Sequence, residues 1–293
     1  MGESIPREAE AYYNRGIEAG RLFRSHGLIE FARTQEIILR HLPSPPCTVL
    51  DVGGGPGAYA CWLASLGHRV ILVDAVPLHV EQARAASARQ PHAPVSDCRQ
   101  GDARHLDAAD ATARAVLLLG PLYHLTERPD RLRAPARSSP RARAGRPSLR
   151  RGGEPLRLSL LSGVADNLLG DPGFAAIVAR DLRDGQHRNA TDKDYFTTTF
   201  FHRPDELEAE VREAGFDLIE LVGVEGPGWL LPDLERRWAD SGRARAPARG
   251  RAGRRARADA PRSAASSARR GGQARLRWRL TPRPGQFTVA SQG

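Results

Sequence analysis

The feature that most constrains the fold is a cluster of glycines directly after a short apolar segment. Residues 48–57 read TVLDVGGGPG, so an apolar run with β-branched members ends at four closely spaced glycines. Glycine is needed where a backbone turns sharply or approaches a ligand closely. Apolar residues at helical spacing follow, and Gly67 stands where a helix C-cap glycine belongs. The pattern predicts a strand, a glycine loop and a helix, the nucleotide-binding start of a doubly wound α/β sheet.

Two classes of ligand use such a unit. The run from Gly53 to Ala58 fits the G-x-G-x-x-G/A pattern of dinucleotide-binding proteins, so an NAD(P)-dependent oxidoreductase is one alternative. Pro56 argues against it, because proline removes a backbone N–H at the helix start, where a pyrophosphate would be bound. The longer pattern VLDVGGGPG resembles motif I of the class I S-adenosylmethionine (SAM)-dependent methyltransferases, an apolar pair and an acid before G-x-G-x-G. SAM has no phosphate to be held at that position.

This resemblance implies a Rossmann-like sheet with SAM bound at the carboxyl ends of its strands. Gly53, Gly55 and Gly57 would shape the cofactor loop. Asp51 would support that loop or bind the amino group of the methionine moiety.

Two further acids are candidate cofactor ligands. Asp74 ends the apolar segment 68–74, at the spacing from the glycine loop where a carboxylate binds ribose hydroxyls in nucleotide-binding folds. A helix-capping role ahead of Pro77 is the alternative. Asp102, in the sequence QGDA, resembles the acid that accepts a hydrogen bond from the adenine amino group in the family, with a plain turn aspartate as the alternative.

Candidate catalytic residues follow the apolar segment 115–119. Gly120, Pro121, Leu122, Tyr123 and His124 come next, where ligands bind in open α/β folds. The segment resembles the lining of the methyl-transfer site in small-molecule methyltransferases, which implies cofactor contact for Gly120 and catalytic roles for Tyr123 and His124. A histidine could accept a proton from the substrate, although a structural role for His124 is the alternative. The three cysteines lack metal-ligand spacing, and no metal site is expected.

Segments on either side of residues 48–133, the SAM-binding half, are expected to close the site. Residues 1–47 are interpreted as an N-terminal helical cap, from which Tyr12, Tyr13 and Arg33 could touch ligand or simply pack and carry surface charge. Residues 161–240 resemble a lid insertion followed by the late helix and strand of the domain. The lid holds an aromatic group that suits either an apolar substrate or plain packing, namely Tyr195, Phe196, Phe200, Phe201 and His202.

The charge of the chain is concentrated in two arginine-rich blocks. The net charge is +10, but residues 134–160 carry +6 and residues 241–293 carry +13, so the rest carries −9. We expect residues 134–160 to be irregular, without the fifth strand, and residues 241–293 to be a disordered tail in which only 286–290 is a weak strand candidate. Translation in a shifted frame would explain both blocks. Basic nucleic-acid-binding segments of an RNA methyltransferase are the rival explanation.

The sequence therefore predicts an α/β methyltransferase with a Rossmann-like doubly wound sheet, a helical cap and a helical lid. The expected reaction moves a methyl group from SAM to a small organic substrate by direct displacement. An RNA methyltransferase, an NAD(P)-dependent oxidoreductase and an inactive remnant are the alternatives. No apolar leader and no membrane span are found, so a cytoplasmic location is expected, with neither nucleic acid nor membrane as partner.

Overall fold

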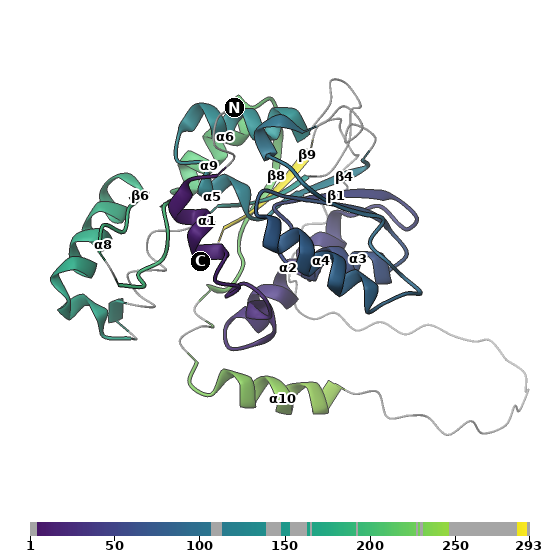
Figure 1. Ribbon diagram of the computed structural model, residues 1–293, viewed down its shortest axis with the longest axis horizontal. Coiled ribbons are helices and arrows are strands. Elements are labelled where there is room, and N and C mark those ends of the chain that lie inside the picture. Colours follow the sequence, from purple (N-terminus) through teal and green to yellow (C-terminus); the bar gives the residue numbers. More distant parts are fainter. Residues whose placement is uncertain are drawn as a thin grey trace, which may run out of the picture.

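The computed structural model describes residues 5–106, 113–138, 148–152, 163–164, 166–191, 193–226, 228, 231–245 and 286–291. Within this part, one large sheet carries helices on both faces (Figure 1). This arrangement is the Rossmann-like α/β fold that the sequence predicts, so the predicted fold class is confirmed.

The large sheet has seven strands in the order β3-β2-β1-β4-β5-β9-β8, and every pairing in it is parallel. Its central strands are almost entirely apolar, as expected for parallel strands that are covered on both faces. The strands are β1 (Thr48–Val52), β2 (Arg69–Asp74), β3 (Asp97–Gln100), β4 (Ala115–Leu118), β5 (Ser148–Gly152), β8 (Asp217–Gly223) and β9 (Gln286–Ser291).

Several helices begin at the proline that the sequence supplies, because the fixed φ of proline suits a first helical turn. Pro77, Pro121, Pro172 and Pro204 each open a helix. The α-helices are α1 (Arg7–Tyr13), α2 (Gly27–His41), α3 (Ala58–Ser65), α4 (Pro77–Ala88), α5 (Pro121–His124), α6 (Arg128–Ser138), α8 (Pro172–Asp184), α9 (Pro204–Glu213) and α10 (Leu234–Arg245), and the 3-10 turns are η1 (Arg21–Phe23), η2 (Ala103–His105) and η5 (Leu168–Gly170).

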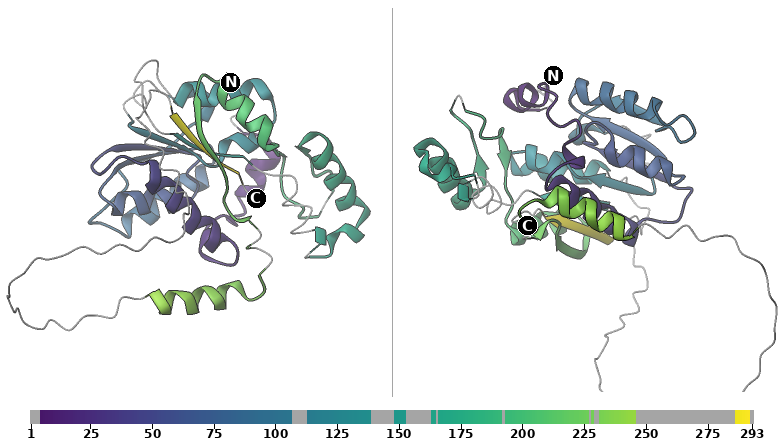
Figure 2. Two further views of the ribbon diagram at one scale, coloured as in Figure 1. Left: turned by 180° about the vertical axis from the view of Figure 1, so that it is seen from behind. Right: turned by 90° about the horizontal axis from the view of Figure 1, so that it is seen from below.

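The core lies on the two faces of the sheet, because successive side chains of a strand point to opposite faces. Val49 of β1 and Leu72 of β2 pack with α2, α3 and α4 on one face. Leu50 and Val73 pack with α5, α6 and α9 on the other face. Figure 2 shows these two helical layers from behind and from below. All four side chains are at least 98% buried, so the strands that carry the site are firmly held.

The expectation that the chain lacks a fifth strand is wrong. Residues 148–152 form β5, which pairs in parallel with β4 on one side and with β9 on the other. Strand pairing uses backbone hydrogen bonds, which any residue except proline supplies, so an arginine-rich segment can fill a gap between two strands. Most of the remaining residues of the first arginine-rich block, 139–147 and 153–160, lie outside the described residues.

The second block also contains ordered backbone. Residues 286–291 form β9, in agreement with the weak strand candidate at 286–290. Helix α10 continues to Arg245, past the predicted start of the disordered tail at residue 241. The segment 246–285 lies outside the described residues, and the shifted-frame explanation stays a hypothesis.

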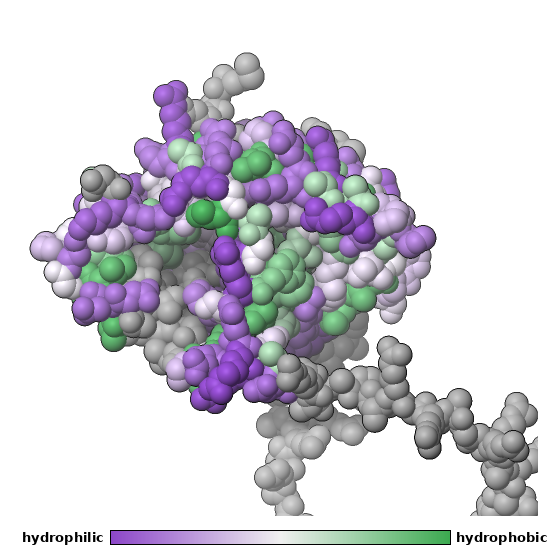
Figure 3. All heavy atoms as spheres, turned by 60° about the horizontal axis from the view of Figure 1, so that its bottom comes forward, coloured by the Kyte–Doolittle hydropathy of each residue, from purple (hydrophilic) through white to green (hydrophobic). Residues whose placement is uncertain are grey.

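Helix α1 and the lid lie beside the carboxyl ends of the strands, whereas α2 packs on one face of the sheet. Helix α1, η1 and α2 make up the N-terminal segment. The lid contains α8 and a small antiparallel ribbon of β6 (Gln186–His187) and β7 (Thr199–Phe200), and it stands to one side of the large sheet (Figure 1). Figure 3 shows a hollow in the face of the molecule beside this lid, with apolar side chains on its walls.

Candidate active site

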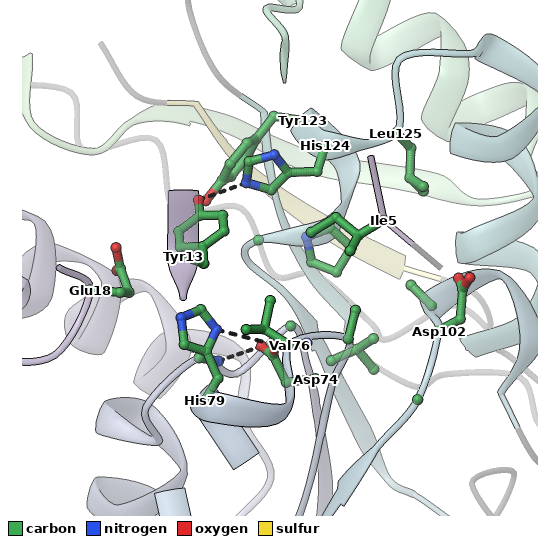
Figure 4. A pocket seen from close by; sticks show the side chains of 18 residues that line it. Ile5, Tyr13, Glu18, Asp74, Val76, His79, Asp102, Tyr123, His124 and Leu125 are labelled. Carbon is green, nitrogen blue, oxygen red and sulfur yellow. Dashed lines mark hydrogen bonds and ion pairs between the residues drawn. The ribbon is translucent and has the colours of Figure 1, made fainter. Parts of the chain in front are cut away.

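A pocket lies at the carboxyl ends of β1, β2, β3 and β4, where the sheet order predicts it (Figure 4). It encloses about 100 Å³ and adjoins a second cavity of about 570 Å³ that shares Gly53, Gly55 and Gly120 with it. Together they offer a space of the size typical of small-molecule sites. Seven of the nine predicted site residues line the first pocket: Gly53, Gly55, Asp74, Asp102, Gly120, Tyr123 and His124. The other two, Asp51 and Gly57, line the adjoining cavity.

The glycine loop is shaped by its lack of side chains. Gly53 has a φ of +69°, and a Cβ atom there would lie 2.5 Å from Cδ of Pro121, at the start of α5. The loop and α5 can therefore approach each other only because residue 53 is glycine. A Cβ at Gly55 would have no neighbour closer than 3.9 Å, so the surface of the loop at Gly55 faces open space. A ligand can thus lie directly against the backbone there.

Asp74 is the buried anchor of this loop. Its Oδ2 accepts a hydrogen bond from the N–H of Gly55 at 2.8 Å, and its Oδ1 accepts from the N–H of Val76 at 2.9 Å. Nδ1 of His79 lies 3.2 Å from the same Oδ1. A carboxylate offers about four lone-pair positions, so one acceptor position is left for a ligand hydroxyl. Val76, not Asp74, is the N-cap of α4, but the bond to the N–H of Val76 ties Asp74 to the start of that helix, so the helix-capping alternative describes part of its role.

Asp102 has a structural role in addition to its place in the pocket wall. It is the N-cap of η2 and accepts from the backbone N–H of Arg104 at 2.8 Å. The guanidinium of Arg104 binds both oxygens of Asp102 and also reaches Asp130 of α6 at 2.8 Å. The alternative interpretation as a turn residue therefore describes part of its role. Recognition of an adenine amino group by Asp102 stays a prediction.

Asp51 lies beneath the loop, fully buried on β1. Neither of its carboxylate oxygens has a hydrogen-bond partner among the described residues. Burial, and after it the charge of Asp74, raises the pKa of Asp51 to about 7. A buried carboxyl without a partner costs free energy, and an incoming ammonium group would relieve that cost.

The other end of the pocket is closed by a tyrosine–histidine pair. The hydroxyl of Tyr13 on α1 lies 2.7 Å from Nε2 of His124 on α5. Nδ1 of His124 lies 3.4 Å from the carbonyl oxygen of Thr198, which can only accept, so Nδ1 carries the proton and Nε2 accepts from Tyr13. The ring of Tyr123 packs 4.5 Å from that of His124. Burial lowers the pKa of His124 to about 4. A neutral imidazole whose lone pair is already used is a weak general base, so a proton-accepting role for His124 stays a prediction.

The low pKa of His124 predicts a dependence of stability on pH. An unfolded histidine titrates near pH 6.5, so between about pH 6.5 and 4 the unfolded state binds a proton that the folded state does not. The free energy of unfolding should be highest above that range and should fall by about 1.4 kcal/mol per pH unit as the pH decreases through it. Urea denaturation of the protein and of His124→Gln at about pH 5 and pH 7 would measure this. Equal pH slopes for the two proteins would contradict the assignment.

The cap and the lid contact each other beside the pocket. The guanidinium of Arg15 binds both carboxylate oxygens of Asp194, at 3.0 and 2.7 Å. The rings of Tyr12 and Phe196 lie 5.4 Å apart, and Phe196 holds a φ of +74°, which is unusual for an aromatic residue. Arg33, a candidate for ligand contact, instead forms an ion pair with Glu36 on the surface of α2.

The aromatic group of the lid serves mainly for packing. Tyr195 packs on Phe174 in the core of the lid, and Phe200 lies under the guanidinium of Arg131. None of the five residues is among those that line the pocket. Phe196, through its contact with Tyr12 and its ring distance of 6.4 Å to His124, comes nearest to the site.

Sequence reasoning missed two polar residues of the pocket wall, Glu18 and His79. Glu18 lies between α1 and η1, where no periodic pattern marks it. His79 had a usable signal, since it stands in the first turn of the helix that follows Asp74.

Comparison with known proteins gives a family match for the part of the chain that begins at β1. A family model described as a methyltransferase domain matches residues 49–139, from β1 through α6. No curated protein matches the chain.

Similar solved structures include three bacterial and archaeal proteins. The YcgJ protein from Bacillus subtilis is 23% identical, with 37% of this chain and 46% of that chain covered and a TM-score of 0.33. A SAM-dependent methyltransferase from Methanosarcina mazei is 18% identical, with 62% of this chain and 84% of that chain covered and a TM-score of 0.45. The magnesium protoporphyrin IX methyltransferase from Synechocystis PCC 6803, with bound SAM, is 15% identical. The match covers 47% of this chain and 71% of that chain, with a TM-score of 0.37. The chain spans about half the length of the YcgJ protein. Because all three TM-scores lie below 0.5, the fold assignment rests on the sheet order instead.

The sheet order, the glycine loop and the acid at the end of β2 define a Rossmann-like protein with a ligand site at the carboxyl edge of its sheet. The family match narrows this class. Residues 49–139 match a methyltransferase domain, which agrees with the resemblance of the glycine loop to the SAM-dependent methyltransferases.

The residues present fit SAM. The unpartnered carboxyl of Asp51 suits an ammonium group, and Asp74 keeps an acceptor position for a ribose hydroxyl. No lysine or arginine is among the described residues that line the first pocket, whereas Arg21 and Arg89 line the adjoining cavity, so the fit to SAM rests on the two carboxylates. In the described part of the chain, no cluster of metal-ligating side chains is present. The helices described are all too short or too polar to cross a membrane.

Proposed function

We propose that this protein transfers a methyl group from SAM to a small organic substrate. SAM supplies an electrophilic methyl carbon on a sulfonium. A substrate nucleophile would form a bond to this carbon while the carbon–sulfur bond breaks. The electron pair of the broken bond would stay on sulfur, and the proton of the nucleophile would pass to solvent water. The chain's contribution is to bind and align the reactants, which alone can lower the barrier substantially.

The observation that carries this proposal is the arrangement around Asp74. One carboxylate holds the N–H of Gly55 in the glycine loop and the N–H of Val76 at the start of α4, and it still faces the pocket. In the proposed binding mode Asp74 accepts from the ribose, Asp102 from the adenine amino group, and Asp51 faces the methionine amino group. Gly53, Gly55, Gly57 and Gly120 provide backbone surface for close approach.

The substrate is proposed to be small, neutral and partly apolar. The pocket end beyond the cofactor positions is lined by Ile5, Tyr13, Tyr123, His124 and Leu125. His124 is neutral near pH 7 because burial lowers its pKa to about 4. An RNA substrate would bring phosphates, which need cationic side chains, and none is among the described residues that line this pocket. Tyr123 and His124 are proposed to orient the substrate nucleophile, with the hydroxyl of Tyr13 fixing His124.

Calorimetric titration with S-adenosylhomocysteine, the product form of the cofactor, tests the proposal. We expect micromolar binding, which corresponds to about −8 kcal/mol. NAD⁺ titrated in parallel should give no signal, since the loop lacks the N–H that Pro56 removes. Binding of NAD⁺ without binding of S-adenosylhomocysteine would favour the oxidoreductase alternative. Salt-dependent binding of an RNA oligonucleotide would favour an RNA methyltransferase.

A further inference from the structure

His79 occupies a position in the pocket wall that the proposed function does not use. It stands in the first turn of α4, which begins at Pro77, and its side chain is buried with 4% of the residue exposed. The same face of α4 buries Val80 and Ala83 against the sheet, so the imidazole is directed to the end of β2 beside Asp74. Figure 4 shows the ring below Tyr13, with Glu18 to the left of both residues and Asp74 to the right of His79.

The contact with Asp74 determines which nitrogen of His79 carries the proton. Nδ1 lies 3.2 Å from Oδ1 of Asp74, and a carboxylate can only accept. When the imidazole is neutral, Nδ1 is therefore the nitrogen that carries the proton, and Nε2 presents a lone pair.

This lone pair has no partner in the described part of the chain. Nε2 of His79 is buried and no described side chain or backbone group hydrogen-bonds to it. The ring of Tyr13 lies 5.1 Å from the imidazole, but the hydroxyl of Tyr13 is directed to His124. Buried acceptors are normally paired, so a buried bare acceptor in a pocket wall indicates that its donor arrives with the ligand.

The neighbouring polar groups indicate what kind of donor this is. Asp74 and Glu18, which line the same pocket, are also acceptors, and Asp74 is bonded to His79 itself. A ligand with two adjacent hydroxyl groups can donate to two adjacent acceptors, one on the carboxylate and one on the imidazole. The adenine amino group would instead lie toward Asp102, at the end of the neighbouring strand β3.

We infer that His79 is a second acceptor for the ribose diol of the cofactor, acting beside Asp74 through Nε2. The inference rests on the proposed function, because the ligand that brings the diol is SAM. His79 then has two functions: Nδ1 orients Asp74, and Nε2 accepts from one ribose hydroxyl. SAM analogues that lack that hydroxyl would leave Nε2 buried and unpaired, so they should bind more weakly than SAM.

Two conservative variants separate these functions. In His79→Asn the side-chain amide N–H takes the place of Nδ1, so Asp74 keeps its donor while the acceptor at Nε2 is lost. In His79→Gln the side-chain carbonyl reaches the position of Nε2, so the acceptor is kept and the contact with Asp74 is lost. His92→Asn, at an exposed position after α4, is the matched control. Thermal melts would verify that each variant is folded.

The measurement is calorimetric titration with S-adenosylhomocysteine and with its 2′-deoxy and 3′-deoxy analogues. We expect His79→Asn to bind S-adenosylhomocysteine about tenfold more weakly than the wild type, with His79→Gln within about threefold and the control unchanged. For the wild type, one of the two deoxy analogues should bind about tenfold more weakly than S-adenosylhomocysteine. For His79→Asn, the same analogue should bind almost as tightly as S-adenosylhomocysteine does.

Two results would overturn the inference. The first is that the wild type and His79→Asn bind S-adenosylhomocysteine with equal affinity. The second is that each deoxy analogue loses as much affinity for His79→Asn as it loses for the wild type. If the wild type did not bind S-adenosylhomocysteine at all, the proposed function itself would fail, and this inference with it. The titration of the wild type therefore distinguishes the two failures.

Discussion

Replacing Asp74 with alanine is expected to weaken the binding of S-adenosylhomocysteine by about 100-fold or more. The change removes the proposed ribose acceptor, and it also frees the N–H of Gly55, whose bond to Oδ2 is 2.8 Å long. A hydrogen bond to a charged group is worth about 1.5 to 3 kcal/mol, and loss of loop support adds to this. The sum corresponds to a factor of about 100 or more.

The experiment needs a control for general effects of removing an acid. Asp97→Ala is suitable, because Asp97 is an exposed residue at the start of β3 that forms an ion pair with Arg99, two residues further along the strand. Calorimetry should show unchanged binding for Asp97→Ala, and circular dichroism should show that both variants are folded. If Asp74→Ala bound as tightly as the wild type, the ribose assignment would be wrong.

Replacing Gly53 with alanine is expected to damage both stability and binding. The residue has a φ of +69°, and the new Cβ would lie 2.5 Å from Cδ of Pro121, which is part of a rigid ring. The unfavourable φ and the overpacking together should cost about 2 to 4 kcal/mol of the free energy of unfolding. This is a large share of the roughly 5 to 15 kcal/mol by which a domain is stable.

Gly223→Ala is the matched control for this substitution. Gly223 ends β8, does not have a positive φ, and a Cβ there would have no neighbour within 4 Å. Urea denaturation should show a change of less than about 0.5 kcal/mol for Gly223→Ala. A stable Gly53→Ala variant that binds S-adenosylhomocysteine normally would show that the loop and α5 do not need their close approach.

The centre of the fold could be predicted because its signals are local. The apolar runs of β1, β2 and β4, the glycine loop and the helix beginning at Pro204 are each readable within about ten residues. The acid at the end of β2 follows from the same logic, since the sheet order places it next to the loop. Seven predicted residues accordingly line one pocket.

Features that depend on distant contacts could not be predicted in this way. The segment 148–152 has no apolar period, and it is a strand because β4 and β9 offer backbone partners on both sides. The pairing of Tyr13 with His124 joins residues 111 positions apart. The burial of His124 and its lowered pKa follow from that packing, so a histidine that the sequence marks as a candidate base is a neutral hydrogen-bond acceptor in the structure.

The position of β9 has a consequence for how the chain acquires its structure during synthesis. Strands β1 to β4 can pair with one another once residues 48–118 have left the ribosome. Strand β8 is made before β9, and among the described strands it pairs only with β9, which comes from residues 286–291. Until those residues emerge, β5 and β8 each expose an unpaired edge that can join to another chain. A nascent chain stalled before residue 286 would therefore hold a completed cofactor loop on an unfinished sheet, and it would be a target for chaperones.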